Sequence, residues 1–152
     1  MHKVHRYHDI SCGHRVVGHE SKCRHLHGHN YRIHFTCTAD TLDDLGRVID
    51  FSVIKEKLCM WVENNWDHKF LAWSEDLMLN DIYFHMAGKI EFKEAFNIQE
   101  SIVFVPFNPT AENMAQHLVS VVGPEVLKGT GVKLIEVKIE ETAKCHASFS
   151  IE

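Results

Sequence analysis

Alternating apolar and polar residues are clearest in the segment NYRIHFTCTA, residues 30–39. Strict alternation is typical of a β-strand that buries one face and exposes the other. The buried set would comprise Tyr31, Ile33, Phe35, Cys37 and Ala39. Extending this parity backwards places His27 and His29 on the same face as Tyr31, so both imidazoles can point into one site.

The same kind of pattern predicts further strands. In VKLIEVKIEET, residues 132–142, the apolar residues share one face, and Glu141 falls on that face. A carboxylate there needs a specific cationic or N–H-rich partner, unless the strand ends earlier. Shorter strand segments are expected at 8–14, at 101–107 and at 147–152.

Two helices are predicted from apolar spacing and capping residues. The first has Ser52 as its N-cap and runs to Asn65, just before the sequence WDHKF. In this interpretation Asp50 is a helix-start or turn residue. The second has Thr110 as its N-cap and a stop signal at Gly123-Pro124.

Strands before and after the helices, without regular βαβ alternation, predict an α+β fold. The sheet would be mainly antiparallel with two helices on one face. The chain has no repeat, low-complexity tract or linker, so a single domain over residues 1–152 is expected. Residues 79–99 fit none of the predicted elements and are interpreted as an insertion.

Composition and charge exclude several classes of partner. With 152 residues and a net charge of −5, the chain lacks the basic surface typical of nucleic-acid or membrane-surface binding. It has no apolar run long enough for a signal peptide or a membrane span, so we expect a cytoplasmic protein. Five cysteines at irregular spacing argue against a disulfide framework.

Histidine is unusually concentrated near the N-terminus. Nine of the 13 histidines fall in the first 34 residues, which indicates a metal site. A catalytic zinc site typically has three protein ligands and one open position. His27 and His29 supply two ligands, and His14 is the best candidate for the third. On spacing alone it competes with His8, His19 and His25.

Cys23, four residues before His27, has two interpretations. It is either a fourth ligand in a closed structural site, or a thiol beside the metal whose field favours the thiolate and makes it a base. Residue types alone leave the two about equal. Asp67 next to His68 favours the second, because a carboxylate near an imidazole suits acid–base chemistry.

Taken in order, six segments make the chain resemble the 6-pyruvoyltetrahydropterin synthase and 6-carboxytetrahydropterin synthase family over nearly its whole length. The segments are ISCGH, CRHLHGHNY, GRVIDF, WDHKFL, NPTAENMA and IEET. The resemblance implies a tunnelling fold (T-fold), in which antiparallel four-stranded sheets with two helices on one face assemble into a barrel. It also implies a homohexamer, a dimer of trimers, with active sites shared between subunits.

The family's functional residues map onto this sequence one by one. The resemblance implies that His14, His27 and His29 bind catalytic Zn²⁺ and that Cys23 is a general base and acid. It implies that His68, assisted by Asp67, is the second proton-transfer group. The residue matching Glu141 holds the pterin ring and belongs to the charge relay, and Thr142 is expected beside the ring.

The three-residue gap between Cys23 and HGH resembles the bacterial queuosine-pathway enzymes. The implied reaction is conversion of 7,8-dihydroneopterin triphosphate to 6-carboxy-5,6,7,8-tetrahydropterin, with loss of triphosphate and acetaldehyde. The alternatives are a 6-pyruvoyltetrahydropterin synthase and a non-catalytic, zinc-stabilised binding module. The sequence departs from the family pattern at ISCG, before the first zinc histidine, and in the long stretch between WDH and NPT.

Overall fold

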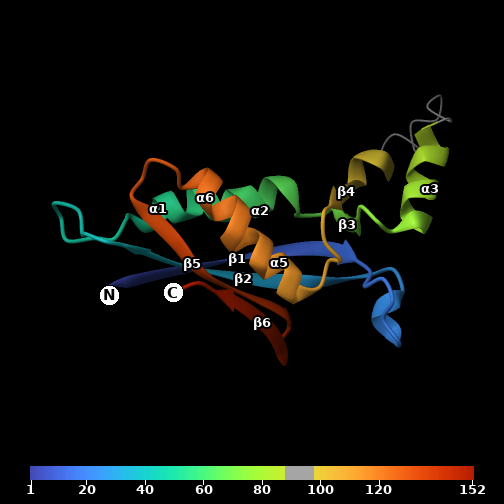
Figure 1. Ribbon diagram of the computed structural model, residues 1–152, viewed down its shortest axis with the longest axis horizontal. Helices are drawn as coiled ribbons and strands as arrows, with labels where there is room; N and C mark the ends of the chain where they lie inside the picture. The colour runs from blue at the N-terminus through green and yellow to red at the C-terminus, as the bar shows by residue number, and fades with distance from the viewer. Residues whose placement is uncertain (88–97) are drawn as a thin grey trace.

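The computed structural model describes residues 1–87 and 98–152, and a long antiparallel ribbon dominates it (Figure 1). The ribbon consists of β1 (Lys3–His14) and β2 (His27–Ala39), which pair along their whole length. The predicted parity of β2 is confirmed, because Tyr31, Ile33 and Phe35 are fully buried. β2 begins earlier than residue 30 and includes both histidines of the HGH segment.

The described residues form one mixed six-stranded sheet in the order β4-β3-β1-β2-β5-β6. The α+β class is confirmed, but the sheet has six strands where four were expected. The expected antiparallel unit is present as β1, β2, β5 and β6, and two short strands add to it in parallel beside β1. Four residues are too few to show an alternation in sequence, so β3 was missed. The further strands are β3 (Phe70–Trp73), β4 (Ile102–Val105), β5 (Val132–Thr142) and β6 (Cys145–Ser150).

The first predicted helix consists of three consecutive segments. They are α1 (Phe51–Ile54), the π-helical turn η2 (Lys55–Cys59) and α2 (Met60–Asn65). Its N-cap is Asp50 rather than Ser52, because the Asp50 carboxylate accepts hydrogen bonds from the Ser52 amide at 2.8 Å and the Ser52 hydroxyl at 2.7 Å. A carboxylate at this position also complements the helix dipole, which a serine hydroxyl does less well.

The second helix begins as predicted and ends later. Thr110 caps α5 (Ala111–His117) by accepting from the Asn113 amide. The π-helical turn η3 (Leu118–Val122) and α6 (Gly123–Val126) then continue it through the Gly123-Pro124 pair. Pro124 stands in the first turn of α6, so the Gly123-Pro124 pair does not stop the helix.

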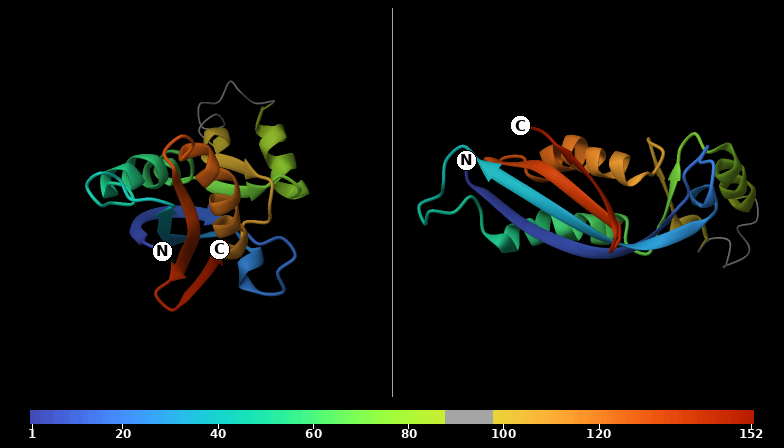
Figure 2. Two further views of the ribbon diagram at one scale, coloured as in Figure 1. Left: turned by 60° about the vertical axis from the view of Figure 1, so that its left-hand side comes forward. Right: turned by 90° about the horizontal axis from the view of Figure 1, so that it is seen from below.

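The two helices cover one face of the long strands (Figure 1), while Figure 2 shows the same layering from the side and from below. The core lies between these layers, where residues such as Phe35, Leu58 and Met114 are almost completely buried. The opposite face of the sheet has no helix on it among the described residues, and side chains such as Tyr7 are exposed there. We call the two sides the helix face and the open face.

Two smaller elements lie between the strands, and residues 98–101 are also helical. The 3₁₀ turn η1 (Lys22–Arg24) follows β1, and α3 (Leu77–Ala87) follows β3. The insertion predicted at about 79–99 therefore begins within α3, but residues 88–97 lie outside the described residues. No helix in the described part of the chain has the length and apolar character needed to cross a membrane.

Candidate functional site

The end of the β1–β2 ribbon brings three imidazoles together on the helix face. His14 pairs directly with His27, and His29 follows at the next position of the same parity. The ligand nitrogens of the histidine triad, His14, His27 and His29, lie within 4.8 Å of one another. All three Nε2 atoms are buried without a hydrogen-bond partner. Three converging unpaired nitrogens are the donor set that a divalent cation such as Zn²⁺ takes.

Main-chain carbonyls fix the orientation of two of these rings. His14 Nδ1 donates to the Pro109 carbonyl at 2.6 Å, and His27 Nδ1 donates to the His25 carbonyl at 2.7 Å. With the proton on Nδ1, the lone pair is left on Nε2, the usual arrangement around a bound metal. Burial, with a smaller contribution from the neighbouring His27 and His29, lowers the pKa of His14 to about 4, although the hydrogen bond to the Pro109 carbonyl acts in the opposite direction. The imidazole is therefore neutral at pH 7, as a metal ligand must be.

The other histidines considered as third ligand have different surroundings. His8 Nε2 lies 2.6 Å from the Glu63 carboxylate on α2. His19 Nδ1 accepts a hydrogen bond from the Ser21 amide. Among the described residues, the histidine triad is the group of His, Cys, Asp and Glu side chains close enough to hold a metal ion. The triad therefore fits the metal, and metal binding itself stays a prediction.

Gly28 allows the two strands of the triad to approach closely. A Cβ at Gly28 would lie 2.9 Å from the Cys12 carbonyl oxygen, which is main chain and cannot move aside. We expect Gly28→Ala to destabilise the fold by about 1–3 kcal/mol and to weaken zinc binding, because β1 and β2 would separate at the triad. Chemical denaturation and a zinc titration of the metal-free protein measure both effects.

Gly13→Ala is the matched control for this prediction, since Gly13 pairs with Gly28 across the ribbon. A Cβ there meets the Phe70 ring at 2.7 Å, and a side chain can rotate away. The alanine at Gly13 should therefore cost less stability and less zinc affinity than the alanine at Gly28. Equal behaviour of the two variants would mean that the close approach at Gly28 does not shape the triad.

Glu141 faces the histidine triad from β5. Its Oε1 lies 3.8 Å from His14 Nε2 and 3.9 Å from His29 Nε2. The pairing of β5 with β6 shifts register between Glu140 and Thr142, so Glu141 is the extra residue of a β-bulge. Bulges redirect side chains and are frequent beside active sites. The Glu141 carboxylate, on an otherwise apolar face, thus has imidazoles as its partners. The predicted strand boundary at residue 142 agrees with the end of β5.

Cys23 lies beside the triad rather than in it. It belongs to η1, and its thiol is not part of the mutually close ligand group. Cys23, Glu141, Thr110, Glu112 and Cys145 help to line a cavity of about 310 Å³, which we call the Cys23 cavity. All five cysteines are free, and burial raises the pKa of Cys12 and of Cys37 to about 12. Cys12 and Cys37 are therefore inert core thiols, whereas Cys23 is half-exposed.

Two hydrogen bonds attach Asp67 and His68 to β1, and a third joins the two residues to each other. The Ser11 amide donates to Asp67 Oδ1 at 2.9 Å, the His68 amide donates to the Ser11 carbonyl at 2.7 Å, and His68 Nδ1 lies 2.7 Å from Asp67 Oδ2. Burial opposes ionisation of Asp67, but the bonds from Ser11 and His68 prevail and lower its pKa. His68 has a φ of +58°, a costly conformation for a non-glycine residue, and its side chain is 80% exposed. Strain of this kind often marks a functional residue.

Within one chain, the Asp67–His68 pair does not meet Cys23. The pair opens into a cavity of about 680 Å³, the His68 cavity, which Asp9, Asn30 and Thr142 also line. Glu63 of α2 lines it as well, and the hydrogen bonds to the Ser11 main chain place the His68 cavity at the outer edge of β1. The Cys23 cavity and the His68 cavity share no lining residue. Thr142 accordingly lies with His68 and not in the Cys23 cavity with Glu141.

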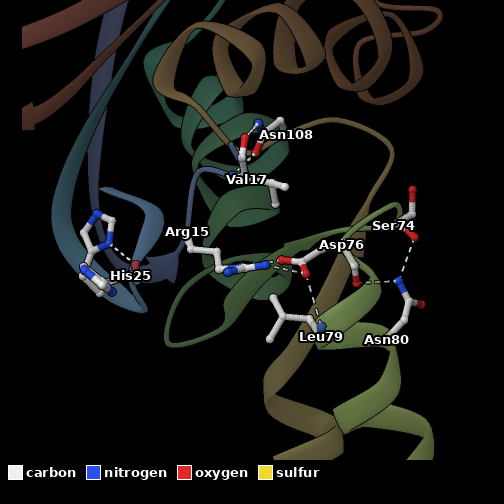
Figure 3. Close-up of polar contacts among 9 residues, drawn as sticks. Arg15, Val17, His25, Ser74, Asp76, Leu79, Asn80 and Asn108 are labelled. Carbon is white, nitrogen blue, oxygen red and sulfur yellow. Dashed lines mark hydrogen bonds and ion pairs between the residues drawn. The ribbon is translucent and has the colours of Figure 1, made fainter. Parts of the chain in front are cut away.

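Two polar contacts that sequence reasoning missed hold the segment between His14 and Cys23 (Figure 3). Arg15 donates to both oxygens of Asp76, at 2.6 and 2.7 Å, and Asp76 is only 1% exposed. The Asn108 side chain pairs with the amide and carbonyl of Val17 at 3.0 and 2.9 Å. Both partners are distant in sequence and neither stands in a metal-site pattern, so the sequence did not indicate these contacts, although Asn108 begins the segment NPTAENMA.

The Arg15–Asp76 pair predicts a pH-dependent contribution to stability. Burial opposes ionisation of Asp76, but hydrogen bonds from Arg15 and the Leu79 amide outweigh it and lower the pKa of Asp76. A lowered carboxyl pKa stabilises the fold above the unfolded-state pKa of about 3.9, and this stabilisation is lost as the pH falls through the folded pKa. Asp76→Asn should therefore cost about 3 kcal/mol at pH 7, as in other broken buried pairs.

Urea denaturation of metal-free protein at pH 7 and at pH 3.5 to 4 measures this contribution, with the exposed Asp44→Asn as control. The difference between wild type and Asp76→Asn should narrow toward acid pH, whereas Asp44→Asn should track the wild type throughout. A constant difference across the pH range would contradict the ion-pair interpretation.

Solved structures with the same architecture identify the fold as a T-fold of the pterin-synthase type. An uncharacterised protein from Wolinella succinogenes superposes with a TM-score of 0.86 at 25% identity, covering 99% of this chain and 98% of that one. The 6-pyruvoyl tetrahydropterin synthase of Caenorhabditis elegans superposes with a TM-score of 0.64 at 20% identity, covering 99% and 95%. The expected fold is therefore confirmed.

Sequence comparison gives the family. The family model described as 6-pyruvoyl tetrahydropterin synthase matches residues 3–152. The 6-carboxy-5,6,7,8-tetrahydropterin synthase of Rickettsia felis is 32% identical over 137 residues, 90% of this chain and 91% of that protein. The protein of the same name from Bacillus subtilis is 33% identical over 89 residues, 58% of each chain. The chain belongs to the 6-pyruvoyl tetrahydropterin synthase family, a family of pterin synthases.

Proposed function

We propose that the protein converts 7,8-dihydroneopterin triphosphate to 6-carboxy-5,6,7,8-tetrahydropterin, releasing acetaldehyde and triphosphate, with Zn²⁺ as its cofactor. The observation that carries the proposal is the triad of unpaired Nε2 atoms beside the cavity lined by Cys23 and Glu141. A purely structural metal site has no need of a half-exposed thiol and a carboxylate next to it. The names of the curated relatives support the carboxy product.

In this proposal His14, His27 and His29 hold the metal, and the carbonyls of Pro109 and His25 keep their rings in the ligating tautomer. A zinc ion supplies Lewis acidity there, which makes the substrate's side-chain hydroxyls more acidic. Glu141 presents its carboxylate to the guanidine-like edge of the pterin, where a charge-assisted pair of hydrogen bonds forms. Thr142 beside the ring stays a prediction.

Proton transfer is assigned to Cys23 and to His68. Cys23 takes protons from the side-chain carbons and returns them from one side, and His68 does so from the other. Asp67 orients the His68 ring through Nδ1 at 2.7 Å. Because the hydrogen shift is internal to the substrate, no redox cofactor is needed.

An assembly of several chains supplies both proton-transfer groups to one site. Cys23 and His68 line two separate cavities, so one chain offers each group to a different cavity. We propose that His68 of one chain faces the Cys23 cavity of another in a homohexamer, a dimer of trimers. β6 is an edge strand of the sheet, and on its outer side β1 pairs with β3 only at Gly13 and His14. Both strands therefore offer edges at which further chains can join to form a barrel.

Two alternatives differ in product or in turnover. A 6-pyruvoyltetrahydropterin synthase would act on the same substrate and release no acetaldehyde. A zinc-stabilised binding module would bind metal and ligand without turnover. The strained, exposed His68 favours an enzyme, because a binding module gains nothing from it.

Incubating the zinc-loaded protein anaerobically with 7,8-dihydroneopterin triphosphate tests the proposal. Mass spectrometry identifies the pterin, and a coupled assay measures acetaldehyde. Carboxytetrahydropterin with acetaldehyde is the expected result, and the pyruvoyl product without acetaldehyde would overturn the carboxy assignment. Zinc bound at one per chain without any turnover would instead favour the binding module. The cytoplasm and the queuosine pathway remain the predicted setting of the reaction.

A further inference from the structure

The hydroxyl of Tyr31 is a buried polar group without a partner. Among the described residues, four buried side-chain polar atoms lack a hydrogen bond, and three of them are the Nε2 atoms of the histidine triad. The fourth is the Tyr31 hydroxyl. Buried tyrosine hydroxyls usually have a partner, so an unpaired one beside a candidate metal site calls for a specific ligand.

Packing places Tyr31 against the triad. Its ring meets the His29 ring nearly edge-on with centroids 5.4 Å apart, and the His14 ring in the same way at 5.9 Å. The Tyr31 ring therefore packs directly against two of the three imidazoles of the triad.

A metal ion would satisfy the three imidazoles but not this hydroxyl. Zinc sites in proteins are built from imidazole, thiolate and carboxylate groups, so the neutral phenol is left over. At neutral pH a tyrosine hydroxyl keeps its proton and offers one directed donor. The group that suits it is a ligand oxygen held over the triad.

We propose that the Tyr31 hydroxyl donates a hydrogen bond to a side-chain hydroxyl oxygen of the bound pterin and so selects substrates hydroxylated on that chain. This inference rests on the proposed function, in which the side-chain hydroxyls lie at the metal. It deepens that function by adding a specificity residue for the substrate's side chain.

Binding measurements with two unreactive pterins test the proposal without turnover. Neopterin carries a hydroxylated side chain and 6-methylpterin does not, and calorimetry gives the affinity of each for zinc-loaded wild type and Tyr31→Phe. Loss of one hydrogen bond should weaken neopterin binding on the order of tenfold and leave 6-methylpterin binding unchanged. Zinc content and the thermal midpoint should stay near wild type, because phenylalanine keeps the ring. Tyr83→Phe, on α3 and away from the triad, is the matched control.

Each other outcome counts against the proposal. If Tyr31→Phe binds both pterins like the wild type, the hydroxyl makes no contact with the side chain. If both affinities fall together, the residue shapes the pterin slot in general, and if zinc is lost, it supports the metal site instead. A wild type that binds neither pterin would refute the proposed function, and this inference with it. A defect confined to the variant leaves the proposed function intact.

Discussion

Replacing Cys23 with alanine is expected to abolish turnover while the protein still binds zinc at one ion per chain. The thiol lies outside the group of triad nitrogens that converge within 4.8 Å, so removing it leaves the ligand set complete. Loss of a general base or acid typically costs 10²- to 10⁴-fold in rate, and we expect a loss of about 10³-fold. Metal analysis of purified Cys23→Ala, together with the acetaldehyde assay, measures both quantities on one sample.

Cys145→Ala is the matched control for Cys23→Ala. Cys145 also lines the Cys23 cavity, but it begins β6 and is assigned no role in proton transfer. This variant should keep both its zinc and its activity. If Cys23→Ala loses its zinc, the thiol is a ligand and the site is a closed structural one. If it keeps full activity, another group is the base.

Local pattern is sufficient to predict the core of the metal site. Residues two apart on a strand share a face. The alternation that begins at Tyr31, extended backwards, is therefore enough to place His27 and His29 on one face. Pattern favoured His14 as the third histidine, since it shares the parity of Ile10 and Cys12, but the spacing alone could not exclude the competing histidines because the third ligand comes from another strand. The register of the β1–β2 pairing sets it opposite His27.

Contacts over long sequence distances could not be predicted in this way. The Pro109 carbonyl that orients His14 is a main-chain group 95 residues away, and no side chain signals it. The Arg15–Asp76 pair spans 61 residues and depends on where β3 ends. These long-range contacts depend on how the segments pack at the edge of the sheet. The periodicity of a single sequence does not indicate them.

The separation of the two proposed proton-transfer groups within one chain was the least predictable feature. Sequence resemblance assigns roles to Cys23 and His68 and implies sites shared between subunits, but it does not say that one chain holds the two residues in separate cavities. Asp67 and His68 are attached to the main chain of Ser11 at the outer edge of β1, and no periodicity in the sequence indicates this tertiary contact.

Mixing two inactive variants should restore activity if sites are shared between chains. Cys23→Ala lacks one proton-transfer group and His68→Ala lacks the other, so each alone is expected to be inactive. In a hybrid assembly, an intact Cys23 from one chain can meet an intact His68 from another. With equal amounts and random association, about one quarter of the sites contain both groups. Unfolding and refolding the two variants together, followed by the acetaldehyde assay, should therefore give about a quarter of wild-type activity.

A second mixture of variants serves as the control for this experiment. Cys23→Ala mixed with the double variant Cys23→Ala/His68→Ala cannot form a complete site and should stay inactive under the same refolding conditions. If the mixture of single variants also stays inactive while size-exclusion chromatography shows hybrid assemblies, each chain must complete its own site. Asp67 and His68 would then have to leave the Ser11 main chain and cross the sheet edge to reach Cys23. The hydrogen bonds that fasten both residues to β1 oppose that movement, which is why we expect the mixture to be active.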